Sequence, residues 1–521
     1  MIEKLKSFLS KDFTLKEGIL TYIILLGLYI LPLITSNLHY RDDYVRVLRG
    51  NDWDILGRRF TDFTMYFLSI NFDAILNISP LNYILSILIL SFTMAHFIQK
   101  IEIKKSLFSH IALSFIVLSP FYLQNLSYQY DSFPMSLSVC LILLAYTQNW
   151  YTAKGFILAL ALIAGSASFF QPATNIYPVL IIGGFLLSLK DNDVSKRIKT
   201  LGLGTLTYLS GLAVYFIWLK FINSVAQTDR AKLIDLNIDA ISSQLKLVIE
   251  LFHIVAGSLV YSPLFLLFSI SLLIFIAHIV VLFVKTKGFL NKSLIIASPV
   301  GLVFFIWGPF ILLEEAFSEA RVFMSMGAIM TIVGFSIIKF LDKKIIFKVI
   351  LFSLVVINCF SMMYIYVNLA KEDDAFNDQL ATSIAYDINS RPELFNLKSV
   401  YINSYPPRTP NSKIVLNNIP FLEYINTPFN VWISRYVIES KGAHHVYKDI
   451  NNMDDKYDWE AICEKKTARL TVSNKNYEIY IIKNDSLVNK THVSVWFKRR
   501  DNLCDDPPNL VFKKYYIKLA Y

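Results

Sequence analysis

The sequence predicts a polytopic α-helical membrane protein that ends in a small soluble α/β domain. Apolar residues make up 55% of the 521 residues and charged residues only 17%, a balance that is unusual for a soluble protein. The apolar residues gather in blocks of about twenty, the length that crosses the hydrocarbon layer of a bilayer. After residue 370 the blocks shrink to the size of strands. We therefore expect a membrane domain, residues 1–370, and a soluble domain, residues 371–521.

The membrane domain contains about eleven apolar blocks, each a candidate transmembrane helix. In chain order they are Gly18–Thr35, Pro80–Ile98, Leu107–Tyr122, Pro134–Tyr146, Gly155–Phe170, Ala173–Leu189, Leu201–Phe221, Leu259–Val284, Ser293–Leu313, Val322–Phe340 and Val349–Leu369. The first block has no small-residue cleavage site before Tyr40, so we expect it to be retained as a span.

Lysine and arginine residues gather in every second connection between the blocks. They are Lys100, Lys104 and Lys105; Lys190, Lys196, Arg197 and Lys199; Lys285, Lys287 and Lys292; and Lys343 and Lys344. Because positively charged connections stay in the cytoplasm, this alternation predicts a bacterial inner-membrane protein with a cytoplasmic N-terminus and a periplasmic C-terminal domain. It also accounts for the net charge of +10 without a basic stripe, so we expect no nucleic-acid partner.

The first periplasmic connection, residues 36–79, is long and rich in charged residues. From Trp53 to Ile70, apolar residues recur at helical spacing, and Asp54, Arg58 and Asp62 fall on the other side. This pattern predicts an amphipathic helix along the periplasmic surface of the membrane. A second periplasmic stretch, residues 223–258, has a weaker pattern that fits either another interfacial helix or a mobile loop.

The C-terminal domain shows short alternating elements. We expect a helix at Ala375–Asn389 that leads into a strand at Ser399–Asn403, and a second helix at Pro428–Lys441. Leu470–Ser473 and Tyr477–Ile482 flank a turn and predict a hairpin. These elements together indicate a small α/β domain.

The four cysteines divide between the two domains. Cys140 and Cys359 lie inside apolar blocks, whereas Cys463 and Cys504 lie in the polar C-terminal domain. In an oxidising compartment Cys463 and Cys504 are expected to form a disulfide. Two unrelated free thiols are the alternative interpretation.

Ionisable residues are scarce within the apolar blocks and gather at their periplasmic ends. They include Asp42, Asp43, Asp131, Glu314, Glu315, Glu319 and Arg321. Residues of this kind at a membrane boundary are candidates for function, although solvated surface charge is the alternative for any one of them. The adjacent pair Asp42 and Asp43 is the strongest candidate, because it follows the first span directly.

The chain has no glycine loop for phosphate and no ligand spacing typical of zinc, so we expect neither a cofactor nor a metal. A sugar carried on a polyprenyl phosphate needs neither, because the donor already stores the energy for transfer. In such a reaction a carboxylate takes the proton of the acceptor hydroxyl. Arginine suits the leaving phosphate because it stays charged and can bind two oxygens at once.

Two segments resemble the Gtr-type O-antigen glucosyltransferases, the serotype-converting enzymes of the GT-C class. They are YRDDYVRVLRGNDWDILGRRF after the first span and SPFYLQNLSYQYDSFPMSLS around the third and fourth spans. The strongest elements of the resemblance are Asp42, Asp43, Gly57, Arg58, Tyr130 and Asp131. The resemblance covers roughly the first two thirds of the chain.

This resemblance implies a GT-C-like membrane domain and an inverting transfer of glucose in the periplasm. The donor would be undecaprenyl phosphate glucose, and the acceptor lipid-linked O-antigen or a related surface glycan, both held among membrane lipids. The catalytic base is expected at Asp42 or Asp43, with Asp42 favoured. The candidates for the donor phosphate are Arg58, Arg230 and Arg321, and those for the acceptor or sugar are Tyr130, Asp131, Gln171 and Glu319.

Two other functions remain as alternatives. A transporter or flippase of lipid-linked sugars would place ionisable groups near the middle of the membrane and often has repeated halves, and the sequence shows neither feature. An O-antigen polymerase would use a diphosphate-linked donor instead.

Overall fold

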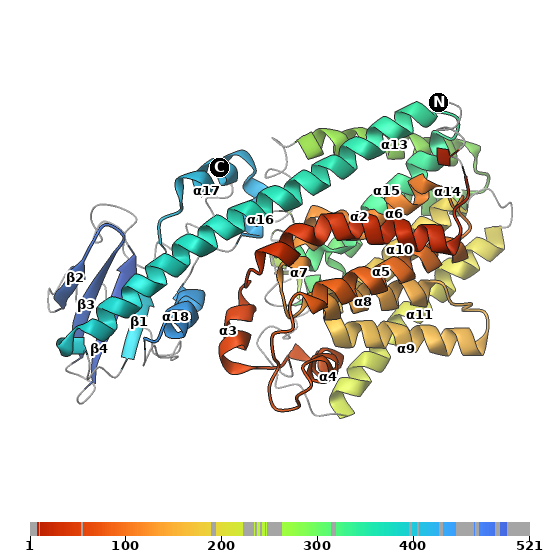
Figure 1. Ribbon diagram of the computed structural model, residues 1–521. Coiled ribbons are helices and arrows are strands. Elements are labelled where there is room, and N and C mark those ends of the chain that lie inside the picture. The colour runs from red at the N-terminus through yellow and green to blue at the C-terminus, as the bar shows by residue number, and fades with distance from the viewer. Residues whose placement is uncertain are drawn as a thin grey trace. The chain divides into compact units, whose positions relative to one another are not determined.

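The computed structural model describes residues 8–9, 11–53, 56–188, 194–221, 234, 237–239, 242–244, 246, 249, 263–313, 319–394, 399–403, 406–426, 431–443, 463, 468–484 and 490–497. The chain divides into two compact units. The membrane unit comprises Met1–Asn37, Asn51–Phe252 and Ser262–Ile365, and the sheet unit comprises Leu38–Gly50, His253–Tyr261 and Tyr366–Tyr521. Figure 1 shows the elements of both units.

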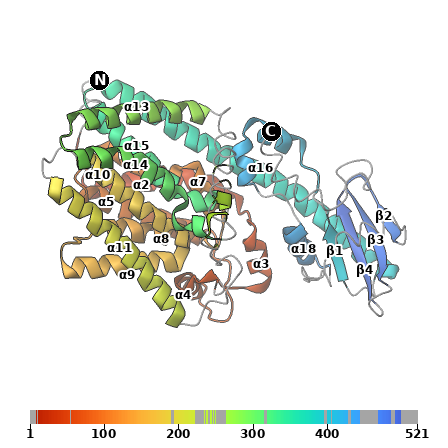
Figure 2. The same ribbon diagram turned by 180° about the vertical axis from the view of Figure 1, so that it is seen from behind.

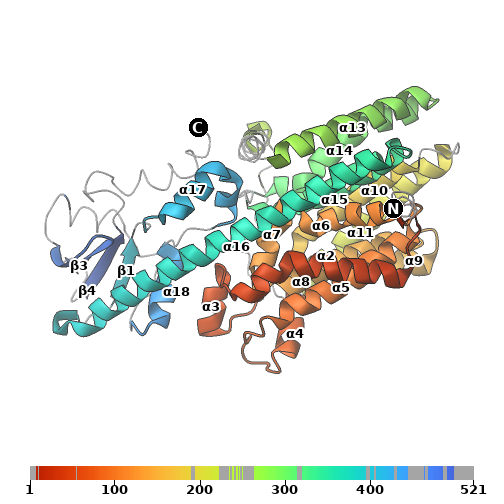
Figure 3. The same ribbon diagram turned by 45° about the horizontal axis from the view of Figure 1, so that its top comes forward.

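The membrane unit is built from helices. They are α2 (Leu15–Ser36), α4 (Arg59–Leu68), α5 (Leu81–Lys100), α6 (Leu107–Leu118), α7 (Pro120–Ser127), α8 (Ser132–Tyr146), α9 (Ala153–Phe170), α10 (Ile176–Leu187), α11 (Val194–Phe221), α13 (Pro263–Lys285), α14 (Phe289–Trp307), α15 (Ser325–Phe340) and the first part of α16 (Ile345–Ser390). Short 3-10 turns include η2 (Gln171–Asn175), η4 (Gly308–Leu312) and η5 (Ala320–Phe323). Helices α9 and α11 lie side by side, as do α2 and α5 (Figures 2 and 3).

Among the described residues, eight helices are long and apolar enough to cross a membrane. The count is nine if the bent pair α6 and α7 forms one span. The protein is therefore a polytopic α-helical membrane protein, as the sequence predicts. The predicted number of about eleven spans is larger than this count.

The third predicted span is a broken helix. Helices α6 and α7 meet at an angle of 56°. The break lies at Pro120, whose ring cannot continue the preceding helix and whose nitrogen carries no hydrogen to donate. The Ser119 hydroxyl accepts a hydrogen bond from the Phe121 amide at 3.2 Å and so caps the second half.

Small residues let the helices of the membrane unit approach closely. The Ser138 and Ser166 hydroxyls lie 2.8 Å apart between α8 and α9. On α15, a Cβ atom added to Gly327 would lie 2.7 Å from the carbonyl oxygens of Phe115 and Ile116 on α6. Only glycine allows this contact between the two backbones.

The connections predicted to be cytoplasmic meet at one end of the membrane unit, which we call the lysine-rich end. The Lys105 amide donates to the Asp12 carboxylate at 3.0 Å, and the Lys339 ammonium donates to the Leu187 carbonyl. One cavity is lined by Lys104, Arg197 and Asp342 from three of these connections, and by Trp150 from the connection between α8 and α9. The observed arrangement matches the predicted alternation of ends, and the sidedness of the membrane remains a prediction.

The sheet unit contains a four-stranded sheet and flanking helices. Its strands are β1 (Ser399–Asn403), β2 (Arg469–Ser473), β3 (Tyr477–Asn484) and β4 (Lys490–Phe497), in the order β1-β4-β3-β2. Strand β1 is parallel to β4, with Tyr401 beside Ser494, and the other pairs are antiparallel. Helices α3 (Asp42–Arg49), α17 (Pro410–Asn418) and α18 (Val431–Ser440), the turns η6 (Pro392–Leu394) and η7 (Pro420–Tyr424), and the end of α16 complete the described elements. The predicted strand and hairpin coincide with β1, β2 and β3.

Two helix predictions need correction. The sequence predicts a separate helix at Ala375–Asn389, but this segment is the end of α16, which continues for 46 residues because no glycine or proline interrupts it. The amphipathic helix predicted from Trp53 is also shorter, because α4 begins at Arg59. Trp53 precedes it and is fully buried.

The charged face predicted for that amphipathic helix is partly wrong as well. Asp62 is buried, because its carboxylate accepts the Trp53 amide hydrogen at 2.7 Å. Phe63 and Phe67 are 65% and 76% exposed, so α4 does present an apolar face outward. Most of the second predicted interfacial stretch, residues 223–258, lies outside the described residues.

Candidate functional site

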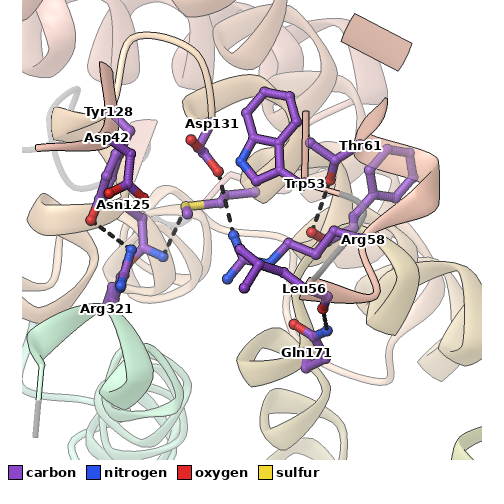
Figure 4. A network of polar contacts seen from close by, with 12 residues as sticks. Asp42, Trp53, Leu56, Arg58, Thr61, Asn125, Tyr128, Asp131, Gln171 and Arg321 are labelled. Atoms are coloured by element: carbon purple, nitrogen blue, oxygen red, sulfur yellow. Dashed lines mark hydrogen bonds and ion pairs between the residues drawn. The ribbon is translucent and has the colours of Figure 1, made fainter. Parts of the chain in front are cut away.

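An ion pair links the first and second predicted periplasmic connections. The Arg58 Nη1 atom lies 3.4 Å from Asp131 Oδ1 (Figure 4). The Arg58 guanidinium also lies 4.7 Å from the centre of the Phe170 ring. The side chains of Arg58 and Asp131 are 12% and 3% exposed. The structure therefore brings together a predicted phosphate-binding residue and a predicted sugar-binding residue. The face of an aromatic ring attracts a guanidinium and restricts its position.

The backbone beside Arg58 is anchored to the start of η2. The Gln171 amide nitrogen donates to the Leu56 carbonyl at 2.9 Å (Figure 4). It also donates to the Tyr215 hydroxyl at 2.9 Å. The Tyr215 hydroxyl donates in turn to the Gly57 carbonyl at 3.2 Å. Gly57 has φ +68°, and a Cβ atom there would lie 3.0 Å from the Tyr215 hydroxyl, so this turn requires glycine. Gln171 thus positions the segment that carries Arg58.

A second guanidinium is held near the same connection. Arg321 pairs with Glu319 at 2.7 Å, donates from Nη1 to the Tyr128 hydroxyl at 2.6 Å, and lies 5.2 Å from the centre of the Tyr128 ring. Its backbone amide donates to Gln124 Oε1 at 2.7 Å. Figure 4 shows Arg321 and Tyr128 facing each other. The predicted residues Arg321 and Glu319 are therefore direct partners.

The connection between α7 and α8 holds both arginines in place. Tyr128 contacts Arg321, and Asp131 contacts Arg58. Because the Cα atoms of residues three positions apart are separated by at most about 11 Å, one short segment contacts both arginines. Gln129 fixes this segment, because its carbonyl accepts from the Asn82 amide at 2.6 Å. Tyr130 is buried in an apolar cluster with Trp53. Sugar binding by Tyr130 stays a prediction.

Asp42 and Asp43 lie in the sheet unit, in the first turn of α3, and differ in their surroundings. The Asp43 side chain is fully buried, and its carboxylate accepts the Tyr40 amide hydrogen at 2.9 Å. The Asp42 side chain is 36% exposed and lies 4.0 Å from Arg46. A carboxylate is favoured at the N-terminus of a helix by the unpaired amides and the helix dipole. Asp43 has this structural role, whereas Asp42 is accessible.

The residues around Asp42 show strain and a buried polar cluster. Arg41 directly precedes Asp42 and has φ +47°, a conformation that is unusual for a residue with a side chain. The Tyr44 hydroxyl donates to the Asp374 carboxylate, and burial together with Asp374 raises the pKa of Tyr44 well above its usual value. The His39 ring lies 5.6 Å from the Tyr44 ring, and burial lowers the pKa of His39.

Several predicted residues lie outside the described part of the chain. They are Arg230, Glu314, Glu315 and Cys504. The disulfide between Cys463 and Cys504 therefore stays a prediction. Cys140 and Cys359 are buried free thiols. Among the described residues, no three or more His, Cys, Asp or Glu side chains form a group that could hold a metal ion.

Sequence reasoning missed Tyr128, Gln124 and Tyr215 as partners of the site. Tyr128 lies within the motif SPFYLQNLSYQYDSFPMSLS, so its place beside Asp131 was a usable signal. Tyr215 lies inside an apolar block, where an aromatic residue is ordinary, so no local pattern distinguishes it.

Carboxylates, aromatic rings and hydrogen bonds fix the orientation of two guanidinium groups in the membrane unit, those of Arg58 and Arg321. Such preorganised positive charge suits a phosphate group that gains charge as it leaves. The family model described as Glucosyl transferase GtrII matches residues 31–332, more than half of the chain. The chain belongs to this family.

One relative of this chain comes from Salmonella phage P22. It is described as an "Uncharacterized 55.3 kDa protein in gtrB 5'region" and is 26% identical over 416 residues, which cover 76% of this chain and 84% of the phage protein. No solved structure matches the chain. The family match includes α3, the Arg58–Asp131 pair and Arg321. The resemblance to the Gtr-type glucosyltransferases is thereby confirmed, and the chain is a membrane-bound glycosyltransferase.

Proposed function

We propose that this GtrII protein transfers glucose from undecaprenyl phosphate glucose to lipid-linked O-antigen or a related surface glycan in the periplasm. The observation that carries the proposal is the pair of guanidinium groups, Arg58 and Arg321, held on either side of the segment Tyr128–Asp131. A polyprenyl phosphate places its phosphate at the membrane surface, where fixed cations can bind it. Membership in a glucosyl transferase family supports the sugar and the reaction class.

The proposed transfer is a single displacement with inversion. The acceptor hydroxyl oxygen attacks the anomeric carbon, and the bond from that carbon to the phosphate oxygen breaks. The phosphate leaves with the bonding electrons as undecaprenyl phosphate, and Arg58 and Arg321 stabilise its charge. The acceptor proton passes to a carboxylate that acts as the general base. The bonds, electrons and proton of this step are accounted for without a metal or a cofactor.

We assign the general base to Asp42. Its carboxylate is exposed enough to meet an acceptor hydroxyl, whereas the Asp43 carboxylate is buried and bonded to the Tyr40 amide. Asp131 and Gln171 are proposed to position Arg58 and its segment, and Glu319 to position Arg321. Arg230 is kept as a further candidate for the phosphate from the sequence alone.

We propose that the chain crosses the membrane eleven times. In the count of eight, α9 and α10 form one span of 35 residues, Ala153–Leu187. A continuous helix would separate Trp150 from Tyr177 by about 40 Å. Their rings lie 5.8 Å apart, and Phe170 between the helices is extended, with φ −158° and ψ 103°. Counting α9 and α10 as two spans raises the number from eight to nine. The broken span α6–α7 and the short helix α8 then raise it to eleven.

An odd number of spans is expected to place the C-terminal domain, residues 371–521, in the periplasm if the N-terminus is cytoplasmic. Alkaline phosphatase fused after Leu369 should then be active, and the same reporter fused after Lys344 should be inactive. The reverse pattern would overturn the proposed orientation.

The proposed reaction is tested with purified full-length protein in lipid vesicles that contain labelled undecaprenyl phosphate glucose and lipid-linked O-antigen. We expect label in the glycan and release of undecaprenyl phosphate in equal amounts. Movement of the labelled donor across the vesicle membrane without transfer would instead establish a flippase. Glycan elongation from a diphosphate-linked donor would establish a polymerase.

A further inference from the structure

A cavity of about 770 Å³ lies at the lysine-rich end of the membrane unit. It is enclosed by α5, α8, α10, α11 and α15 and by the connections at their ends. The Arg58–Asp131 pair and Gln171 lie at the other end, because η2 and α10 separate Gln171 from Leu187 at the cavity. The proposed transfer reaction therefore leaves this cavity unused.

Arg197 is the buried cation of the cavity. It lines the space, its side chain is only 8% exposed, and its Nε atom is buried without a hydrogen-bond partner. Within the described part of the chain, Arg197 forms no ion pair. A buried guanidinium without a counter-charge is strongly unfavourable, because it loses its hydration without compensation. The burial of Arg197 therefore favours an anion in the cavity.

The charges around Arg197 also favour an anion. Lys100, Lys104 and Lys339 line the cavity together with Arg197, whereas the lining carboxylates are Glu102 and Asp342. Four cations face two carboxylates, which leaves two positive charges in excess. Lys339 already donates to the Leu187 carbonyl, which holds its ammonium at the cavity.

The remaining lining is apolar and extends away from the cations. Phe97, Leu180, Ile181, Phe335 and Ile338 contribute to it. A free inorganic anion would gain nothing from these side chains, whereas the glycerol and upper acyl chains of a lipid would bury apolar surface against them. Basic pockets between transmembrane helices at the cytoplasmic side are a known type of site for anionic lipid head groups.

We propose that this cavity binds one anionic glycerophospholipid, whose phosphate pairs with Arg197 and whose glycerol and acyl chains pack on the apolar lining. The lipid then bridges connections that are far apart in the sequence. With the proposed orientation, it belongs to the cytoplasmic leaflet. The binding itself does not depend on the transferase proposal.

The test is native mass spectrometry of delipidated full-length protein titrated with phosphatidylglycerol or with phosphatidylcholine. We expect the unmodified protein to bind phosphatidylglycerol about 10-fold more tightly than the zwitterionic lipid. Arg197→Gln should remove this preference, and Arg197→Lys should keep most of it. Lys199→Gln is the matched control, because Lys199 lies on the same helix but outside the cavity.

Lys104→Gln provides a second variant in case Arg197→Gln does not fold, since Lys104 is exposed and its loss should leave folding intact. We expect it to weaken phosphatidylglycerol binding by about 3-fold. Asp193→Asn tests whether the acidic residue four positions before Arg197 in the sequence, which lies outside the described residues, neutralises Arg197. We expect phosphatidylglycerol binding to stay unchanged, whereas clearly tighter binding would show that Asp193 supplies the counter-charge and would overturn the proposal.

Three further results would overturn the proposal. One is equal binding of phosphatidylglycerol by the Arg197→Gln and unmodified proteins. A second is displacement of the lipid by millimolar inorganic phosphate, which would identify a site for the free anion. A third is preferential binding of undecaprenyl phosphate over phosphatidylglycerol, which would assign the cavity to the carrier lipid.

Discussion

Arg58 and Asp131 form an ion pair, with 3.4 Å between Nη1 and Oδ1, although they lie 73 residues apart in the chain. Asp131 is almost completely buried, and Arg58 is a partner of its carboxylate. Arg58 has two tasks in the proposed mechanism, since it satisfies this carboxylate and binds the donor phosphate.

The two tasks of Arg58 can be separated by a double variant. Arg58→Gln should lower stability by about 3 kcal/mol, because it leaves a buried carboxylate without this partner. The double variant Arg58→Gln/Asp131→Asn should regain most of the stability, yet its transfer activity should remain about 10-fold to 100-fold low. Thermal melting in detergent and the vesicle transfer assay measure the two effects. Full activity in the double variant would show that the pair is only structural.

Arg321 is expected to act on the donor directly. Arg321→Gln should reduce transfer about 10-fold to 100-fold, because it removes charge-assisted hydrogen bonds to the leaving phosphate. Lys154→Gln is the control, since Lys154 is an exposed cation at the start of α9. Unchanged transfer in the Arg321 variant, with normal folding, would remove this residue from the site.

Asp42 and Asp43 should respond differently to the same isosteric change. Asp42→Asn should lower transfer about 100-fold to 10,000-fold with normal melting, because it removes the general base. Asp43→Asn should lower stability by about 1 kcal/mol, because the amide can still accept the Tyr40 hydrogen but lacks the negative charge that the N-terminus of α3 favours.

Comparison of turnover and melting for the two aspartate variants decides the assignment. Normal turnover in a well-folded Asp42→Asn protein would move the base to another carboxylate, with Asp131 and Glu319 as the next candidates. Loss of turnover in Asp43→Asn without any loss of stability would reverse the two roles.

The sheet unit should lose stability in mild acid through His39. Burial lowers the pKa of His39 below its usual value of 6.5, so the folded state binds this proton less readily than the unfolded state. The stability that depends on the neutral ring is complete above pH 6.5 and is lost as the pH falls through and below that value. Melting temperatures at pH 7.5 and pH 5.5 should differ less in His39→Gln than in the unmodified protein. An identical difference in both proteins would exclude His39 as the cause.

The predicted disulfide between Cys463 and Cys504 is open to a direct test. Peptide mapping by mass spectrometry under non-reducing conditions should recover the two cysteines in one linked peptide, which reduction separates. Cys463→Ser should free the Cys504 thiol for alkylation, whereas Cys140→Ser should not. Detection of two alkylated thiols in the unmodified, unreduced protein would rule out the bond.

Local sequence patterns predicted the elements well wherever a local physical requirement sets them. The thickness of the bilayer sets the length of the apolar blocks. The alternation of apolar and polar residues in β1 and in the hairpin β2–β3 indicates a sheet with one buried face. The same reasoning failed at Trp53, which precedes α4, and at Asp62, which is buried within α4, because a hydrogen bond joins these two residues. It failed again at Ala375, where a helix continues across a change in composition.

The sequence by itself determined that this protein is polytopic, that its basic connections alternate, and that acidic and arginine residues gather at one set of span ends. These properties follow from length, hydropathy and charge along the chain. Only the tertiary structure decided that Arg58 meets Asp131, that Arg321 meets Tyr128, and that Asp43 is buried while Asp42 is partly exposed. Such pairings depend on how distant segments pack against one another, and no local pattern carries that information.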